Sequence, residues 1–303
     1  MRILVTGGTG SFGQAFIRRL LVSADQSQQL VVFSRDELKQ HEMRAAGLND
    51  ERMRYFIGDV RDRDRLRRAF RGVDVVVHAA ALKQVESCEF NPLEAKKTNI
   101  DGTSNVIDAA LDCGVGRVLM IGTDKAVDPT NLYGATKLVA EKLMVDANAY
   151  SGQDGPAFSC TRYGNVISSR GAVLPVFQAQ HAAGLPLTVT DPTMTRFVLT
   201  LDQGVDFVLD CLGRMRGGEV FVPRLKTVTV ATISYAVAPS SPRVVIGRRP
   251  GEKQHELLIS ANEPELAAAN GLPYPYGSNT DLADRLDVVG FRELAGFNEK
   301  VAA

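Results

Sequence analysis

The stretch TGGTGSFG, residues 6–13, lies between an apolar run at residues 2–6 and a helical pattern that begins at residue 12. Three of its four glycines, Gly7, Gly10 and Gly13, recur at every third position. Glycine at such a junction allows a tight turn, a close approach of the backbone to a bound phosphate, and close contact between helix and sheet. Free N–H groups at the start of a helix also attract anions. The stretch therefore predicts a strand, a phosphate-binding turn and a helix in succession.

Outward from this stretch, short apolar runs alternate with amphipathic segments, as in repeated βαβ units. The runs expected to form strands are Arg2–Thr6, Leu30–Phe33, Arg54–Ile57, Val75–His78, Arg117–Ile121, Ala157–Tyr163 and Glu219–Phe221. The segments expected to form helices are Phe12–Leu21, Glu37–Ala46, Asp62–Phe70, Pro92–Leu111, Leu132–Ala149 and Leu201–Leu212. Continuous Val, Ile and Leu runs are typical of buried parallel strands. The expected fold class is α/β, with a Rossmann-type doubly wound parallel sheet.

The rhythm of the sequence changes after about residue 165, where glycine and proline separate shorter elements. We expect residues 1–165 and 196–223 to form the dinucleotide-binding domain. Residues 166–195 and 224–303 are expected to form a smaller, discontinuous α/β lobe that binds the substrate.

The composition excludes several classes of protein. Lys+Arg and Asp+Glu number 35 each, so no global charge attracts nucleic acid or a membrane surface. The four cysteines and four histidines show no spacing typical of metal ligands, and free thiols suit a reducing cytosol. No stretch approaches the roughly 18 apolar residues of a membrane-spanning helix, and the N-terminus lacks the features of a signal peptide. We expect a soluble cytoplasmic protein without a metal site.

The residues that follow the second strand bear on the choice of cofactor. An acidic residue there would bind the ribose 2′-hydroxyl of NAD, whereas arginine suits the 2′-phosphate of NADP. The sequence has Ser34 and Arg35 before Asp36, which favours NADP and keeps NAD as the less favoured alternative. Arg35 could also be only a solvated surface charge.

Residues after the third and fourth strands complete the expected cofactor site. Asp59, followed by Val60, could meet the adenine amino group, or it could instead cap the next helix. Small side chains after the fourth strand would let the backbone pass close to the ribose and nicotinamide. The residues expected to bind the cofactor are Gly7, Thr9, Gly10, Ser11, Phe12, Gly13, Ser34, Arg35, Asp59, Val60, Ala79, Ala80, Ala81, Tyr133 and Lys137.

Tyr133 and Lys137 are four residues apart on a predicted helix and therefore share a face. An ammonium beside a phenol stabilises the phenolate and lowers the tyrosine pKa from near 10. Such a tyrosine can accept a proton from an alcohol while hydride leaves for a nicotinamide. A surface pair is the alternative, but the glycine turn and the strand end that carries Thr123 favour catalysis.

With these motifs the sequence resembles the extended branch of the short-chain dehydrogenase/reductase superfamily. More narrowly, it resembles the inverting UDP-N-acetylglucosamine 4,6-dehydratases of bacterial polysaccharide and flagellin-sugar biosynthesis. Matching segments run almost continuously to about residue 260. They are TGGTGSFG (6–13), SRDELKQ (34–40), GDVRD (58–62), HAAALKQV (78–85), CEFNPLEAKKTNIDGTSNVI (88–107), TDKAVDPTNLYGATK (123–137), RYGNVISSRGAVLP (162–175), DPTMTRF (191–197) and RPGEKQHE (249–256).

The resemblance implies a role for each residue around Thr123, which would hold the substrate oxygen. It makes Asp124 the acid that protonates the leaving C6 hydroxyl and Lys125 the base that takes the C5 proton. Such a lysine must be largely neutral near pH 7, which requires desolvation or a nearby positive charge such as that of Lys137. A simple ion pair between Asp124 and Lys125 is the alternative. Further residues that the resemblance places near the nucleotide sugar are Lys83, Asn165, Arg196, Arg249 and Glu252; the two arginines could instead be ordinary surface arginines.

The expected reaction is therefore transient oxidation at C4, elimination of water across C5 and C6, and return of hydride to C6 with inversion at C5. A 5,6-dehydratase or epimerase that acts on another nucleotide sugar or a nucleoside is the first alternative. A non-catalytic NADP-binding protein is the second, because fold does not dictate function. The resemblance also implies a homo-oligomer.

Overall fold

The computed structural model describes residues 1–23, 27–152, 154–167 and 172–297. By the contacts between its residues, the chain forms two compact units, each assembled from separate segments. The first unit comprises Met1–Gly122, Leu132–Arg162 and Val205–Phe221. The second comprises Thr123–Asn131, Tyr163–Gly204 and Val222–Ala303.

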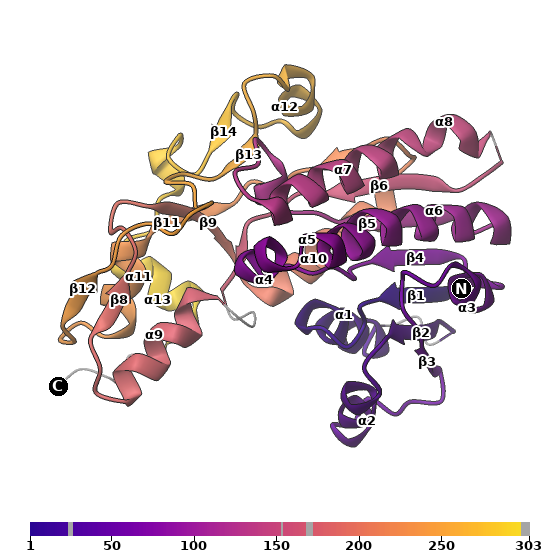
Figure 1. Cartoon of the computed structure of the whole chain (residues 1–303), viewed down its shortest axis with the longest axis horizontal. Coiled ribbons are helices and arrows are strands. Elements are labelled where there is room, and N and C mark those ends of the chain that lie inside the picture. Colours follow the sequence, from indigo (N-terminus) through magenta and orange to yellow (C-terminus); the bar gives the residue numbers. More distant parts are fainter. Residues whose placement is uncertain (24–26, 153, 168–171, 298–303) are drawn as a thin grey trace. The chain divides into compact units, whose positions relative to one another are not determined.

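The first unit is built on a seven-stranded parallel sheet with the strand order β10-β6-β5-β4-β1-β2-β3. In Figure 1 the strands follow one another in this order from β3 to β6. Their bounds are β1 Arg2–Thr6, β2 Gln29–Ser34, β3 Met53–Ile57, β4 Val75–His78, β5 Arg117–Ile121, β6 Ala157–Thr161 and β10 Val220–Phe221. The order reverses direction at β1 and β4, as in a doubly wound sheet, which confirms the predicted fold class.

Helices connect these strands, and several of them bury apolar residues against the sheet. They are α1 Ser11–Leu21, α2 Glu37–Ala45, α3 Arg63–Phe70, α4 Val85–Phe90, α5 Pro92–Lys96, α6 Gly102–Cys113, α7 Leu132–Asp146 and α8 Asn148–Ser151; α10, Leu201–Arg214, begins in the second unit and continues in the first. Leu66 of α3, Val106 of α6 and Met144 of α7 share one core with alternate strand residues such as Val76 and Val118. Because successive strand residues point to opposite faces, the intervening Val75 and Val77 are buried on the other face.

One predicted helix differs in detail. The segment predicted as a single helix from Pro92 to Leu111 is interrupted by η1, a π-helical turn at Lys97–Asp101. Such turns often occur at functional sites because they redirect a side chain. The buried Asn99 lies in η1: its amide oxygen accepts from the Leu82 N–H at 2.8 Å, and its amide nitrogen donates to Thr136 Oγ1 at 3.0 Å. The turn thus ties the loop after β4 to α7.

The described residues of the second unit form three small sheets. Their strand orders are β11-β9-β7, β12-β8 and β13-β14. The strand bounds are β7 Asn165–Val166, β8 Leu187–Val189, β9 Thr195–Leu199, β11 Lys226–Thr229, β12 Arg243–Val245, β13 Leu257–Ile259 and β14 Tyr276–Gly277. The helices are α9 Val173–Ala182, α11 Val230–Val237, α12 Pro264–Asn270 and α13 Val288–Leu294, with short 3₁₀ turns η2 Asp124–Ala126 and η3 Leu282–Asp284. One apolar core joins α9, α11 and α13 through Phe177, Ile233 and Phe291.

The grouping by contacts differs from the predicted division at two long segments and, by two or three residues, at the boundaries near residues 163 and 222. Residues 123–131 and 196–204 belong to the second unit, whereas the sequence analysis assigned both to the dinucleotide-binding domain. Strand β9 pairs with β7 and β11 and not with the seven-stranded sheet. The domain boundaries at residues 165, 195 and 223 stay a prediction; residues 168–171 and 298–303 of the predicted lobe lie outside the described residues.

Candidate active site

The glycine turn after β1 is shaped by close backbone contacts. Gly7 has a φ of +67°, and a Cβ there would lie 2.9 Å from the backbone of Ala80. A Cβ on Gly13 would lie 2.5 Å from Gly8 Cα. Within the described chain, no side chain caps the start of α1 and no acidic residue occupies its first turn. The turn therefore leaves a narrow backbone cradle and a helix N-terminus, which together fit a dinucleotide phosphate.

The ends of β2 and β3 carry the residues predicted to choose the cofactor. Asp36 caps α2, because its carboxylate accepts from the Lys39 N–H at 3.0 Å, and it also pairs with Lys39 Nζ at 2.6 Å. Ser34 Oγ accepts from Gln40 Nε2 at 3.1 Å. The half-exposed Arg35 guanidinium lies 3.6 Å from Asp59 Oδ2. Asp36 is thus engaged by its own helix, whereas Arg35 and Ser34 remain at the strand tip.

Asp59 accepts hydrogen bonds from the Arg61 side chain at 2.7 and 3.0 Å. Burial raises the pKa of Asp59, but the bonds from Arg61 outweigh burial and lower it overall. Asp62, not Asp59, is the N-cap of α3, because its carboxylate accepts from the Arg65 N–H at 2.9 Å. The capping alternative for Asp59 is therefore wrong. Arg61 was not predicted, and no pattern in its neighbours indicated the contact.

A buried hydrogen-bond chain fixes the small residues after β4. The Ala80 N–H donates to Thr6 Oγ1 at 3.3 Å, and His78 Nδ1 lies 2.7 Å from the same hydroxyl. His78 Nε2 lies 3.2 Å from Thr103 Oγ1. Burial, with a smaller contribution from Lys137, lowers the pKa of His78 to about 3, so the imidazole is neutral. These hydrogen bonds hold the Ala79–Ala81 segment beside Gly7. Lys83, two residues further on, is exposed.

Tyr133 and Lys137 lie in the first two turns of α7 and are both buried. Lys137 Nζ donates to the Ile121 carbonyl at 2.9 Å, at the end of β5. Burial lowers the pKa of Lys137 to about 8, against the smaller opposing effects of Cys160 and Glu141. Thr136 Oγ1 donates to the Tyr133 carbonyl at 2.8 Å and receives the bond from Asn99. Asn99 therefore orients this turn, and sequence reasoning missed it.

Thr123, Asp124 and Lys125 form a hydrogen-bonded group in the second unit. Thr123 Oγ1 donates to Asp124 Oδ1 at 3.0 Å and accepts from the Lys125 N–H at 3.3 Å. Lys125 Nζ donates to the same Asp124 oxygen at 3.1 Å. The ion pair considered as an alternative is therefore present. It does not exclude an acid–base function, because a bond of this length also lets a proton pass between the two groups.

The charge of Lys125 is the main correction to the sequence analysis. Burial alone would lower its pKa, but the carboxylates of Asp124 and Glu256 outweigh burial and raise the pKa above its ordinary value. Glu256 Oε1 lies 3.6 Å from Lys125 Nζ. The pKa of Asp124 is itself raised, chiefly by burial. The expectation of a neutral Lys125 is wrong in this arrangement, because Glu256, which is distant in the sequence, lies beside it.

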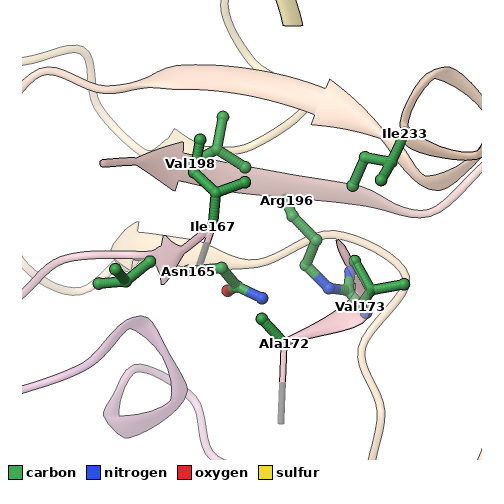
Figure 2. A pocket seen from close by; sticks show the side chains of 8 residues that line it. Asn165, Ile167, Ala172, Val173, Arg196, Val198 and Ile233 are labelled. Atoms are coloured by element: carbon green, nitrogen blue, oxygen red, sulfur yellow. The ribbon is translucent and has the colours of Figure 1, made fainter. Parts of the chain in front are cut away.

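Two of the predicted substrate residues line a pocket within the second unit, together with apolar neighbours. Its lining is Asn165, Val166, Ile167, Ala172, Val173, Arg196, Val198 and Ile233. Figure 2 shows Asn165 and Arg196 as the polar side chains of this pocket. Asn165 Oδ1 accepts from Lys125 Nζ at 3.5 Å, which links the pocket to the Asp124–Lys125 ion pair. Arg196 donates to the carbonyls of Thr195 and Gln254 at 2.7 and 3.2 Å.

Arg249 and Glu252 lie in one turn, where the Arg249 N–H donates to Glu252 Oε2 at 3.3 Å. Gly251, between them, accepts from Thr130 Oγ1 and Asn131 Nδ2, each at 2.9 Å. This turn is thereby held against the end of the segment that carries Asp124 and Lys125. The structure leaves the Arg249 side chain exposed.

Two kinds of feature are absent from the described residues. No group of three or more His, Cys, Asp or Glu side chains within them could hold a metal ion. In the same part of the chain, no helix has both the length and the apolar character needed to cross a membrane.

The parallel sheet, the glycine turn and the Tyr133–Lys137 pair define an extended short-chain dehydrogenase/reductase. Within this class, the chain belongs to the family described as polysaccharide biosynthesis protein, which matches residues 3–271. The inverting UDP-N-acetylglucosamine 4,6-dehydratase of Campylobacter jejuni (strain ATCC 700819 / NCTC 11168) is 49% identical over 300 residues, 99% of this chain and 89% of that protein. A UDP-glucose 4-epimerase of Rickettsia prowazekii is 43% identical over 268 residues, 86% of this chain and 78% of that protein.

Solved structures give the same classification. Pen from Bacillus thuringiensis superposes with a TM-score of 0.90 at 33% identity, over 98% of both chains. DesIV, the dTDP-glucose 4,6-dehydratase of Streptomyces venezuelae, superposes with a TM-score of 0.73 at 26% identity, over 99% of both chains, and was solved with NAD bound.

Proposed function

We propose that this protein is a nucleotide-sugar 4,6-dehydratase that acts on UDP-N-acetylglucosamine and inverts C5. The observation that carries the proposal is the hydrogen bond between the buried Asp124 and the partly buried Lys125. Elimination of water needs an acid for the leaving C6 hydroxyl and a base for the C5 proton, whereas epimerisation at C4 needs neither. The similarity to the Campylobacter jejuni dehydratases, at 45% and 49% identity, supports the same choice of substrate.

The cofactor would be a nicotinamide dinucleotide held by the glycine turn, the tips of β2 and β3, and the residues after β4. When bound, its nicotinamide would supply the hydride chemistry, oxidation at C4 and reduction at C6. NADP is the proposed form, because Arg35 is a cation at the tip of β2 and Asp36 is engaged in capping α2. NAD, which is bound in DesIV, is the less favoured form.

The side chains would carry the protons of three successive steps. Tyr133 takes the proton of the sugar 4-hydroxyl, and the Lys137 ammonium favours its phenolate form. Thr123 holds the substrate oxygen. A shift of one proton from Lys125 Nζ to Asp124 Oδ1 gives a neutral amine and a protonated carboxyl together. Lys125 then takes the C5 proton while Asp124 protonates the departing C6 hydroxyl, and a proton later returns to the opposite face of C5.

Asn165, Arg196, Arg249, Glu252 and Lys83 would contact the nucleotide sugar. Arg196 and Arg249 suit a diphosphate, because guanidinium groups bind phosphate oxygens in pairs. We further propose that the protein acts in the cytoplasm as a homo-oligomer. The exposed apolar side chains of Phe90 and Leu93 support assembly, which the mass in solution would test.

The test is NMR of the purified protein with UDP-N-acetylglucosamine in deuterated water, without added cofactor. A 6-deoxy-4-keto product that carries deuterium at C5 is expected, with the inverted C5 configuration. An epimer at C4 would instead support the second candidate, a 4-epimerase, which the Rickettsia relatives favour. Unchanged substrate, with the cofactor bound, would reject this substrate.

A further inference from the structure

Glu256 is a buried acidic residue that none of the steps above uses. It directly precedes β13, and only 3% of its surface is exposed. Its backbone is fixed by Ser278, because the Glu256 N–H donates to Ser278 Oγ at 2.9 Å and its carbonyl accepts from the Ser278 N–H at 2.8 Å. Ser278 Oγ in turn lies 2.6 Å from Thr195 Oγ1. The carboxyl group is thus presented from a rigid backbone.

The Glu256 carboxylate lies between two lysines. Oε1 is 3.6 Å from Lys125 Nζ, and Oε2 is 3.7 Å from Lys253 Nζ. Within the described residues, Oε2 has no hydrogen-bond partner, and neither has Asp124 Oδ2. A buried carboxylate with incomplete hydrogen bonding costs free energy of folding, so its presence needs a reason other than stability.

The pKa values of the two carboxyl groups that flank Lys125 are shifted in opposite directions. Burial raises the pKa of Asp124. Burial also raises that of Glu256, but Lys125, Arg196 and Lys253 outweigh burial and lower it overall. Carboxyl groups whose surroundings separate their pKa values in this way commonly have separate functions, one as acid and one as a fixed negative charge.

We propose that Glu256 is a positioning residue of the elimination step, which holds the Lys125 amine and stabilises the positive charge that Lys125 gains from the C5 proton. This inference rests on the proposed dehydratase function. In the step, the C5–H bond breaks and its proton bonds to Lys125 Nζ. The electron pair forms the C5–C6 double bond, and the C6–O bond breaks as the Asp124 proton joins the departing oxygen. Asp124 ends as a carboxylate and Lys125 as an ammonium, while Glu256 stays negative throughout.

Removing the negative charge of Glu256 has a predictable effect on the pair. The charged groups around Lys125 and Glu256 are Asp124, Arg196 and Lys253. Without Glu256, the remaining cations would favour deprotonation of both Asp124 and Lys125, so both limbs of the pH–rate profile would move to lower pH. A residue with only a structural role would lower the rate at every pH and leave the limbs in place.

The first test needs no substrate. In protein labelled with ¹³C-lysine, the Lys125 Cε resonance is assigned with Lys125→Arg and followed against pH in the wild type and in Glu256→Gln. We expect Lys125 to titrate at a lower pH in Glu256→Gln, by at least about one pH unit. Glu256→Asp, which keeps the charge, should restore much of the difference. If Lys125 has the same pKa in the wild type and in Glu256→Gln, the proposal is overturned, whatever the substrate proves to be.

The second test measures turnover of UDP-N-acetylglucosamine by the same variants. Glu256→Gln should lower kcat roughly 10- to 100-fold with KM changed less than about threefold, because the charge acts on the transition state. Reduced nicotinamide should accumulate, since oxidation at C4 precedes the slowed step. Glu265→Gln, at an exposed glutamate in the first turn of α12, is the control and should match the wild type. Circular dichroism confirms folding.

Each outcome of the second test has a separate meaning. A lower kcat with the pH limbs moved to lower pH supports the proposal, and wild-type kcat or unmoved limbs in Glu256→Gln would overturn it. A wild-type protein that leaves this sugar unchanged would reject the proposed function. The titration of Lys125 would then show separately whether Glu256 stabilises the positive charge of the Lys125 ammonium.

Discussion

Lys137 illustrates at a single residue how a functional group can oppose stability. Its folded-state pKa of about 8 lies below the ordinary value of 10.5. Burying the charge of Lys137 therefore lowers the free energy of unfolding. This cost is fully present at pH 7, where the lysine is charged in both the folded and unfolded states, and it disappears as pH rises past the unfolded pKa. At about 1.4 kcal/mol per pKa unit, the burial of this charge costs about 3 kcal/mol.

Lys137→Met should therefore be inactive yet more stable than the wild type at pH 7, by about 1–3 kcal/mol, with the gain shrinking as pH rises from 8 towards 10. Urea unfolding across this range measures it. Lys142→Met, at an exposed lysine on the same helix, should show no such trend. A Lys137→Met variant that is less stable than the wild type by a constant amount would contradict the argument.

His78 predicts a loss of stability in acid. Its pKa of about 3 in the folded protein lies below the ordinary 6.5, so the unfolded chain binds the extra proton first as pH falls. The contribution of His78 to the free energy of unfolding is fully present above pH 6.5 and is lost progressively as pH falls towards 3. Between pH 7 and pH 5 the wild type should lose about 2 kcal/mol from this residue.

Denaturant unfolding of His78→Gln at the two pH values checks this, because the variant should lack that part of the decline. The exposed His41 offers the matched change, His41→Gln, which should keep the wild-type dependence on pH. An equal loss of stability between pH 7 and pH 5 in all three proteins would show that His78 does not cause it.

At the scale of elements, the glycine turn and α1 depend on contact between backbones. Gly13→Ala would place a Cβ 2.5 Å from Gly8 Cα, so the helix or the turn must move. We expect a loss of about 1–3 kcal/mol in stability and a cofactor affinity at least roughly tenfold lower. Gly213→Ala in α10, whose added Cβ meets no atom within 4 Å, should be neutral or slightly stabilising. Calorimetric titration with NADP and urea unfolding compare the two.

The elements also show why part of the structure could be predicted. Strands such as Val75–His78 and Arg117–Ile121 were predicted to the residue, because buried parallel strands are continuous apolar runs between turns. The interruption at Lys97–Asp101 was not, because a π-helical turn leaves the polar and apolar pattern of a helix intact. Glu256 was missed for another reason: its partner Lys125 is distant in sequence, and periodicity carries no information about such pairs.

For the whole molecule, binding of the cofactor should appear as global stabilisation. A ligand at about 100 times its Kd adds about 2.7 kcal/mol, which raises Tm by about 5 °C in a chain of this size. NADP should raise Tm more than NAD does. Arg35→Ala should remove the preference, whereas Arg68→Ala, at another exposed arginine, should keep it. Equal shifts for both dinucleotides in the wild type would favour NAD as the natural cofactor.

The assembly of the second unit from separate segments has a consequence during translation. Lys253 donates a hydrogen bond to the Val127 carbonyl, although 126 residues separate them in the chain. At 5–20 residues per second, on the order of 10 s pass between the synthesis of these two partners. A ribosome-bound chain therefore exposes Asp124 and Lys125 long before Glu256 has been made. A messenger RNA truncated before the Glu256 codon therefore yields a protein that has the glycine turn and the Tyr133–Lys137 pair but lacks Glu256 beside Lys125.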